Sequence, residues 1–278
     1  MPELPEVETL VRGLRPRIVG RAILRVRLGK TDFMDNPAEI ERDLPGQRIT
    51  AITRHGKFFC LTLENGREPA RALLVHLGMT GHLATFDPHE PEPKHTHLVA
   101  ALDDGRELRY TDPRRFGRIA IFTTEQFNAL LTKGGAEPLT VTCADFCRAL
   151  HARDAQIKAL LLNQNVFGGI GNIYADESLW RARIHPARKA SRVPLAQLKA
   201  LHSAVQKILN AAIASRGSSI SNYRDAAGQP GEFQLRHRAY DREGQPCFRC
   251  RTRLRRTIVA GRSSYWCPQC QPAPRTRR

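Results

Sequence analysis

The first three residues, Met1, Pro2 and Glu3, place a proline and a carboxylate at the start of the chain. We expect Met1 to be removed because the second residue is small, which leaves Pro2 with a free terminal amine. An α-amine titrates at about pH 8 and a lysine at about 10.4, so roughly a tenth of the terminal amine is neutral at pH 7. A neutral amine can attack a sugar C1′ or an aldehyde to form a Schiff base, and Glu3 could donate a proton or stabilise charge there.

Two Cys-x-x-Cys pairs, Cys247 with Cys250 and Cys267 with Cys270, are separated by sixteen residues. This spacing is typical of a tetrahedral site in which four thiolates bind one Zn²⁺. Zn²⁺ has no redox chemistry and four thiolates leave no open position, so we predict a structural metal. Two disulfides or redox-active pairs are the alternatives, which an odd total of seven cysteines disfavours.

The chain carries a formal net charge of +17 at pH 7. Its last 43 residues, 236–278, contain twelve arginines and two acidic residues. Such an excess indicates a polyanionic partner, usually nucleic acid, and arginine suits bidentate phosphate contacts. Basic and apolar residues alternate between the cysteine pairs, which predicts a hairpin whose arginines fit DNA. A basic protein without a polyanionic partner, a lipid-surface protein and a solvated arginine face are the alternatives.

Length and composition predict a folded chain of about two domains. The chain has 278 residues, 41% hydrophobic and 26% charged, which excludes wholesale disorder. Its apolar runs are shorter than about 18 residues and its start is acidic, so we expect no membrane span, no signal peptide and a cytoplasmic location. The glycines at 168–171 do not complete the Gly-x-Gly-x-x-Gly pattern, so no nucleotide cofactor is expected.

Hydrophobic spacing divides the chain into a β-rich half and a helical half. Apolar residues at helical spacing over 3–14 predict one amphipathic helix. Short alternating runs from 18 to 122, with Asn-Gly and Asp-Gly turns, predict antiparallel strands in a sandwich or barrel. Residues 217–235 are expected to form a long loop. Helices are expected at 143–152, 154–163, 172–182 and 194–216.

Five motifs, in this order along the chain, resemble those of the formamidopyrimidine-DNA glycosylase family, whose bacterial members excise 8-oxoguanine. They are MPELPEVET (1–9), HLGMTGHL (76–83), YTDPRRFG (110–117), GGIGNIYADE (168–177) and the four-cysteine finger. The resemblance runs from Met1 to about Gln271. Leu4 stands where the related endonuclease VIII group typically has glycine, which favours oxidised purines over oxidised pyrimidines.

The resemblance implies an α+β fold with DNA bound in a cleft between domains. A catalytic domain, an N-terminal helix plus an antiparallel β-sandwich, would span 1–133. A helix–two-turn–helix DNA-binding domain with the lesion-recognition loop would span 134–235. A zinc-finger hairpin (236–271) would follow. The residues after it, 272–278, depart from the family, and we expect them to form a flexible basic tail.

The resemblance also implies roles for five residues. Pro2 would attack C1′ of the damaged nucleotide, expel the base and form an iminium, with Glu3 as the proton donor. Glu6 would orient the site. Lys57 would act in β-elimination, although a lysine that points to solvent is the alternative. Arg262 would act in δ-elimination and grip phosphates beside the lesion.

DNA contacts around the lesion are implied in the same way. Met79, Arg114 and Phe116 would fill the gap left by the extruded nucleotide, because an apolar wedge and a donor-rich arginine partly replace lost stacking and pairing. A place for Met79 and Phe116 in the hydrophobic core is the alternative. Phosphate contacts are expected from His95, Arg153, Lys158 and Asn172.

These residues predict a monomeric DNA glycosylase and abasic-site lyase for oxidised purines in double-stranded DNA, located at the nucleoid and using Zn²⁺ only for structure. An endonuclease VIII-like enzyme for oxidised pyrimidines is one alternative. A protein that binds lesions without cutting is another, and the combination of Pro2, Glu3 and Lys57 argues against it. The chain departs from the family at Tyr240-Asp241, where a Tyr-Gly pair is common.

Overall fold

The computed structural model describes residues 1–66, 70–220 and 223–274. The chain forms two compact units. The first contains residues 1–133 together with 215–232, and the second contains 134–214 and the chain from 233 onward. The segment 215–232, which the sequence division assigns to the helical domain, therefore packs with the N-terminal part of the chain.

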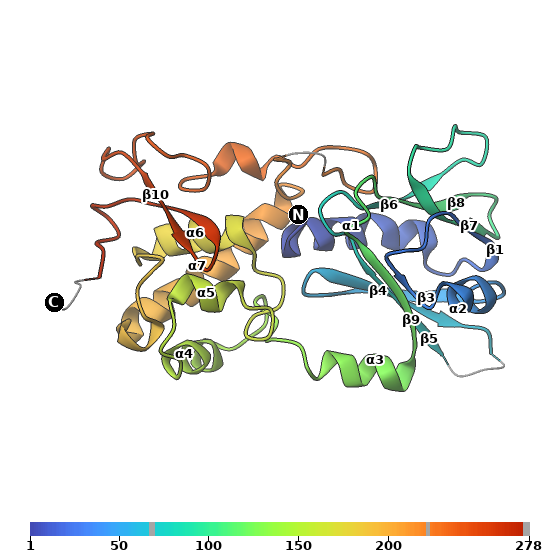
Figure 1. The fold of residues 1–278 in the computed structure, drawn as a ribbon, viewed down its shortest axis with the longest axis horizontal. Helices are drawn as coiled ribbons and strands as arrows, with labels where there is room; N and C mark the ends of the chain where they lie inside the picture. The colour runs from blue at the N-terminus through green and yellow to red at the C-terminus, as the bar shows by residue number, and fades with distance from the viewer. Residues whose placement is uncertain (67–69, 221–222, 275–278) are drawn as a thin grey trace. The chain divides into compact units, whose positions relative to one another are not determined.

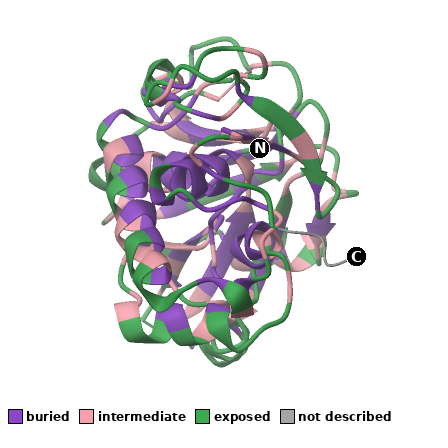
Figure 2. Cartoon of the chain, turned by 90° about the vertical axis from the view of Figure 1, so that its left-hand side faces the viewer, coloured by how far each residue is buried: buried purple, intermediate pink, exposed green. Residues whose placement is uncertain are grey.

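Helix α1 (Leu4–Ile18) and two sheets form the first unit, which confirms the predicted helix and β-sandwich (Figure 1). Buried side chains of α1 and of both sheets belong to one hydrophobic cluster, so a single core holds the unit together. Figure 2 shows the burial of the residues along the chain, with buried segments in purple. The four-stranded sheet has the order β1 (Ile23–Leu28), β7 (Thr96–Leu102), β8 (Glu107–Thr111), β6 (His82–Phe86). The five-stranded sheet has the order β2 (Met34–Asp35), β9 (Arg118–Thr123), β5 (Arg71–His76), β4 (Phe58–Glu64), β3 (Arg48–His55).

The middle of the five-stranded sheet is buried on both faces. Cys60 and Leu74 point away from the main core and form a second apolar cluster with Phe127 of helix α3 (Thr124–Leu131). Because both faces are covered, β4 and β5 have continuous apolar runs instead of the alternation of a half-exposed strand. The sheet thus gives a rigid base to the turns at its ends.

Helices α2 (Pro37–Asp43) and α3 were not predicted from the sequence. Both are shorter than the window in which a helical period becomes visible. Helix α3 does carry a capping box that could have revealed it. The Thr123 hydroxyl accepts the N–H of Gln126 (3.2 Å), and the Gln126 side chain accepts the N–H of Thr123 (3.0 Å).

The second unit combines helices with a C-terminal hairpin. The four predicted helices are present, and the second of them starts three residues later than expected. None of the helices in the described part of the chain has the length and apolar composition needed to cross a membrane. The elements are α4 (Cys143–His151), α5 (Ile157–Leu162), α6 (Asn172–Ala182), η1 (Ala190–Arg192), α7 (Leu195–Ala214), η2 (Phe233–Arg236), β10 (Arg255–Val259) and β11 (Arg262–Trp266).

We predict that Thr123→Ala lowers the free energy of unfolding by about 1 kcal/mol, because it leaves the Gln126 amide without its cap. Thr123→Ser keeps the hydroxyl and is expected to retain wild-type stability. Urea unfolding followed by circular dichroism measures both. Equal midpoints for the alanine and serine variants would show that the cap does not stabilise α3.

Candidate functional site

The N-terminal residues are buried at the start of α1. Pro2 is buried, Glu3 is 4% exposed, and Met1 ahead of them is 48% exposed. The backbone N–H of Glu3 donates to Oε2 of Glu6 (2.8 Å), which belongs to the first turn of the helix. A chain end is usually frayed, and this bond orders the backbone directly after Pro2.

Glu6 also holds the loop 215–232. Its Oε1 accepts the N–H of Ser218 (2.7 Å), and its backbone carbonyl accepts the hydroxyl of Tyr223 (3.0 Å). Gly217 has a φ of +78°, and a Cβ there would lie 2.7 Å from Oε1 of Glu6, so this close approach requires glycine. The contacts join residues more than 200 positions apart, and no sequence pattern indicated them.

Lys57 lies in the turn between β3 and β4 and is only 7% exposed, so it is not a solvent-pointing lysine. Burial and the nearby charges of Lys57 and Arg118 lower the pKa of His76 to about 4. His76 is therefore neutral at pH 7, and its Nδ1 accepts the N–H of Gly78 (3.1 Å). His76 thus lies near the charge of Lys57 and also binds the backbone of the turn that carries Met79.

The three residues predicted to fill the gap in the DNA are exposed in the first unit. Met79 is 44% and Phe116 is 54% exposed, so the alternative of core residues is wrong. The Arg114 guanidinium lies over the Phe116 ring, 4.4 Å from its centre. A Cβ on Gly78 would lie 2.3 Å from the backbone of Phe116, so the two turns pack directly against each other.

Asp112 holds the turn that presents Arg114 and Phe116. Its Oδ2 accepts the N–H of Gly117 (2.8 Å), and its Oδ1 accepts the Thr80 hydroxyl. The backbone N–H of Asp112 donates to the carbonyl of His95 (3.0 Å), which places His95 at the base of the same turn. Sequence reasoning did not single out Asp112, although carboxylates that bond nearby backbone amides are typical of turns.

The other predicted phosphate contacts belong to the second unit. Arg153 follows α4, and its guanidinium donates to the carbonyl of Ala149. Lys158 is fully buried, and its ammonium forms an ion pair with Asp176 (2.7 Å). Asn172 begins α6 and donates through its Nδ2 to a backbone carbonyl of β11 (3.0 Å). Lys158 and Asn172 therefore bind protein groups in this structure, and their contact with phosphate stays a prediction.

The four cysteines of the finger gather into a metal-binding cluster. Their sulfur atoms all lie within 4.8 Å of one another, and the Cys250–Cys267 and Cys250–Cys270 pairs are 3.4 and 3.5 Å apart. Sulfurs around a tetrahedral Zn²⁺ are about 3.8 Å apart, whereas a disulfide requires about 2.05 Å. The donor set thus fits one structural Zn²⁺ and not two disulfides.

Helix α6 anchors the segment that leads into the finger. The buried carboxylate of Glu177 accepts the backbone N–H groups of Arg238, Ala239 and Tyr240 at 2.8–3.0 Å. The next residue, Asp241, has a φ of +57°. Aspartate tolerates this left-handed conformation better than most residues, so the turn keeps a geometry that glycine would otherwise supply.

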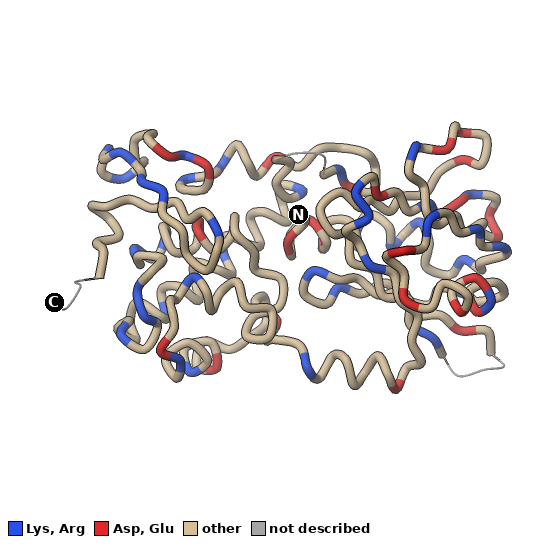
Figure 3. The backbone as a smooth tube through the Cα atoms, in the orientation of Figure 1, with Lys and Arg blue, Asp and Glu red and all other residues tan. Residues whose placement is uncertain are grey.

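Arg262 lies at the tip of the finger hairpin and is exposed. It pairs with Val259 across a two-residue turn, Ala260-Gly261, in which both residues have positive φ. This turn type matches the twist of a hairpin. Arginines on β10 and β11 face solvent, and Figure 3 shows the basic residues of both units. Of the predicted tail, residues 275–278 lie outside the described residues.

Three family models match consecutive parts of the chain. The formamidopyrimidine-DNA glycosylase N-terminal domain matches residues 1–119, the formamidopyrimidine-DNA glycosylase H2TH domain matches 135–224, and the zinc finger found in FPG and IleRS matches 244–273. A formamidopyrimidine-DNA glycosylase from Chloroflexus aggregans is 44% identical over 277 residues, which cover 98% of each chain. The chain belongs to the formamidopyrimidine-DNA glycosylase family.

Solved structures of the formamidopyrimidine-DNA glycosylase family share this fold. Lactococcus lactis Fpg in a complex with abasic-site DNA is 34% identical, with a TM-score of 0.89 over 98% of this chain and 100% of that one. MutM (Fpg) from Thermus thermophilus is 39% identical, with a TM-score of 0.85 over 99% and 100%. The fold, the helix–two-turn–helix domain and the four-cysteine zinc finger expected for the family are thereby confirmed.

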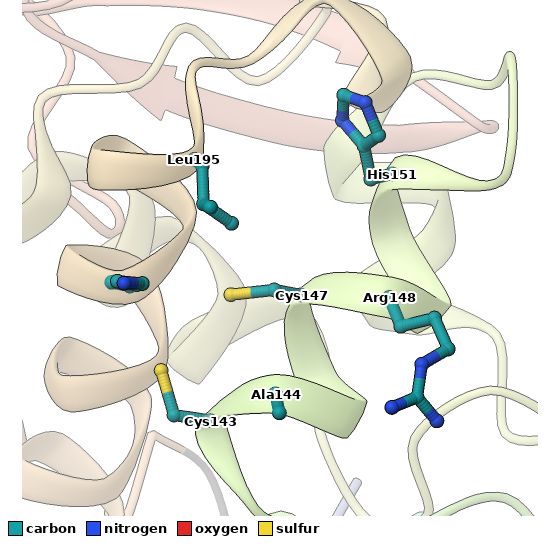
Figure 4. A pocket seen from close by; sticks show the side chains of 7 residues that line it. Cys143, Ala144, Cys147, Arg148, His151 and Leu195 are labelled. Carbon is teal, nitrogen blue, oxygen red and sulfur yellow. The ribbon is translucent and has the colours of Figure 1, made fainter.

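A separate pocket of about 650 Å³ lies between α4 and α7 (Figure 4). Cys143 and Cys147, one helical turn apart, point their sulfurs toward α7, and Leu195 lies across from them. Burial and the neighbouring Cys143 raise the pKa of Cys147 to about 11, so its thiol is protonated at neutral pH. None of the residues predicted to contact DNA lines this pocket.

We predict that Cys250→Ser removes the bound zinc and weakens DNA binding, because three thiolates no longer complete the tetrahedral site. Cys143→Ser changes a cysteine outside the cluster and is expected to keep one zinc per chain. Metal content by atomic absorption and affinity by fluorescence anisotropy distinguish the two. Full zinc content in the Cys250 variant would disprove the four-thiolate assignment.

We predict that acid destabilises the protein partly through His76. Its pKa of about 4 in the folded chain lies below the 6.5 of an unperturbed histidine, so only the unfolded chain binds this proton between those values. The free energy of unfolding therefore falls as pH drops through that window, by up to about 1.4 kcal/mol per pH unit. His76→Asn, which keeps an acceptor for the Gly78 amide, is expected to show a shallower fall in urea titrations. If the free energy of unfolding fell equally steeply with pH in the wild type and in His76→Asn, His76 would not be the cause of the acid destabilisation.

Proposed function

We propose that this chain is a base-excision repair glycosylase that removes the oxidised purines 8-oxoguanine and formamidopyrimidines from double-stranded DNA and then cleaves the strand. Relatives with the same fold were solved with DNA that contains Fapy-dG, carbocyclic 8-oxo-G or an abasic site. The observation that carries the proposal is the order imposed by Glu6. One carboxylate binds the amide of Glu3 and the amide of Ser218, and so fixes the reactive terminus and the loop beside it.

Base release uses Pro2 and Glu3. Once Met1 is removed, the Pro2 nitrogen attacks C1′ of the damaged nucleotide, and the bond from C1′ to the base breaks. Glu3 supplies the proton for this step. Opening of the sugar ring then converts the new C1′–N bond into an iminium.

Strand cleavage follows from the iminium, which withdraws electrons and makes the C2′ proton acidic. Loss of that proton expels the 3′ phosphate, and a second elimination expels the 5′ phosphate. We assign Lys57 to the first elimination and Arg262 to the second. Lys57 is suited to this role because it is only 7% exposed. It lies close enough to His76 for its charge to add to the effect of burial, which is the main cause of the lowered pKa of that histidine.

Met79, Arg114 and Phe116 take the place of the extruded nucleotide. Flipping a base costs a few kcal/mol of stacking and pairing. Exposed apolar side chains can restore stacking, and the Arg114 guanidinium can donate to the orphaned base. Phosphate contacts would come from Arg262, Arg153 and His95. The protein would act as a monomer at the nucleoid.

We predict that borohydride traps a covalent adduct between the protein and a duplex that contains 8-oxoguanine, because reduction fixes the iminium. Pro2→Gln, whose larger second residue keeps Met1 in place, is expected to abolish trapping, and Glu3→Gln to slow it by at least about 10²-fold. Glu41→Gln, at an exposed glutamate of α2, is the matched control and should react normally. Gel shift of the labelled strand measures the adduct.

Two other outcomes would overturn the proposal. Tight binding of the duplex without any adduct would identify a lesion-binding protein that does not cut. Faster processing of an oxidised pyrimidine than of 8-oxoguanine would identify an endonuclease VIII-like enzyme instead.

A further inference from the structure

Side chains of α5 and α6 hold the outer edge of β11 in the second unit. The Lys158 ammonium donates to the carbonyl of Ser263 (2.8 Å), and Asn172 Nδ2 donates to the same oxygen (3.0 Å). Two residues further along the strand, Asp176 Oδ2 accepts the N–H of Tyr265 (3.0 Å). These side chains thus replace the neighbour strand that an edge otherwise lacks.

Asp176 acts on both points of attachment. It binds Tyr265 directly, and its Oδ1 forms the ion pair with Lys158 (2.7 Å) that aims the ammonium at Ser263. The side chains of Lys158 and Asp176 are both 0% exposed. Solvent therefore does not compete for either group, and the geometry has little freedom.

Arg262 directly precedes Ser263 at the start of β11. Ser264, between the two attachment points, is also fully buried. The strand is consequently fixed at 263, 264 and 265, and the exposed Arg262 extends from the first of these fixed residues. The other strand of the hairpin, β10, pairs with the opposite edge of β11, so the outer edge is held by the side chains of α5 and α6.

We infer that Asp176 is a positioning residue for the δ-elimination: it fixes β11 directly and through Lys158, and thereby sets the place of Arg262. The inference rests on the proposed function, in which Arg262 acts at that step. Asp176 itself touches neither the substrate nor the reacting atoms.

The energetics of the pair favour a geometric role over a stabilising one. A buried ion pair often adds little net stability, because desolvation offsets the attraction between the charges. Burial raises the pKa of Asp176 to about 7 in spite of the adjacent ammonium, which shows how large that desolvation is. What the pair does supply is two fixed bonds to the backbone of the strand that carries Arg262.

The test is the balance of products that the zinc-loaded, full-length enzyme makes from an abasic-site duplex. β-Elimination alone leaves an unsaturated aldehyde at the 3′ end, and δ-elimination leaves a phosphate. The double variant Lys158→Met/Asp176→Leu replaces the pair by apolar side chains, a change that often preserves folding. We expect a δ-to-β product ratio lowered by about tenfold or more. Because Lys158 is also a predicted phosphate contact, the β-elimination yield of each variant serves as the reference for this ratio, and unchanged trapping is expected only of a variant that keeps Lys158.

Asp176→Asn provides a second variant of the same size. It keeps an acceptor for the Tyr265 amide and loses the charge that orients Lys158, so we expect a fall of about threefold in the product ratio. Asp154→Asn is the matched control, because it removes an exposed carboxylate that pairs with Lys189 in the same unit. It should leave the ratio unchanged.

A wild-type product ratio in the folded double variant would overturn the inference. An equal loss of trapping, β-elimination and δ-elimination, together with lost zinc, would also overturn it, because the pair would then be merely structural. Absence of trapping in the wild-type enzyme would instead refute the proposed function, so the two failures are distinguishable.

Discussion

The first unit depends on one carboxylate that serves two distant segments. In the proposed function a reactive amine at the chain end must be held still, yet a terminus has covalent support on one side only. Glu6 solves this by accepting the amide of Glu3 with one oxygen and the amide of Ser218 with the other. Gly217 has a left-handed backbone conformation and no Cβ, and both features allow the loop to approach that oxygen closely. The loop and the terminus therefore cannot shift independently, and a change in one alters the bond that orders the other.

The second unit uses the same device with different residues. Asp176 and Glu177 are adjacent on α6, both are buried, and both bind backbone amides of the C-terminal module. Trp180, one turn further along, donates its indole N–H to the sulfur of Cys247 (3.4 Å). The zinc ion fixes the finger internally, whereas helix α6 fixes it to the unit. A small metal-bound hairpin has too little core to orient itself, so this attachment determines where its arginines point.

Much of the architecture could be predicted because its signals are local. The start of α1, the hairpin turns and the four cysteines are each defined within a few residues of sequence. Helices α2 and α3 were missed because seven or eight residues do not establish a period. The partners of Glu6 and Lys158 were missed for another reason. Contacts over 100 or 200 positions arise only when the chain has folded, and neither residue type nor spacing encodes them.

The stack of Arg114 on Phe116 has a kinetic consequence. The guanidinium rests on the ring, and Asp112 holds the turn that carries both side chains. In the proposed function, neither side chain would have to search rotamers before it probes a base pair, so little entropy would be lost on entry to the helix. The pace at which such a protein inspects a duplex would then be set by the opening of the base pair itself, with weakly stacked sites sampled first.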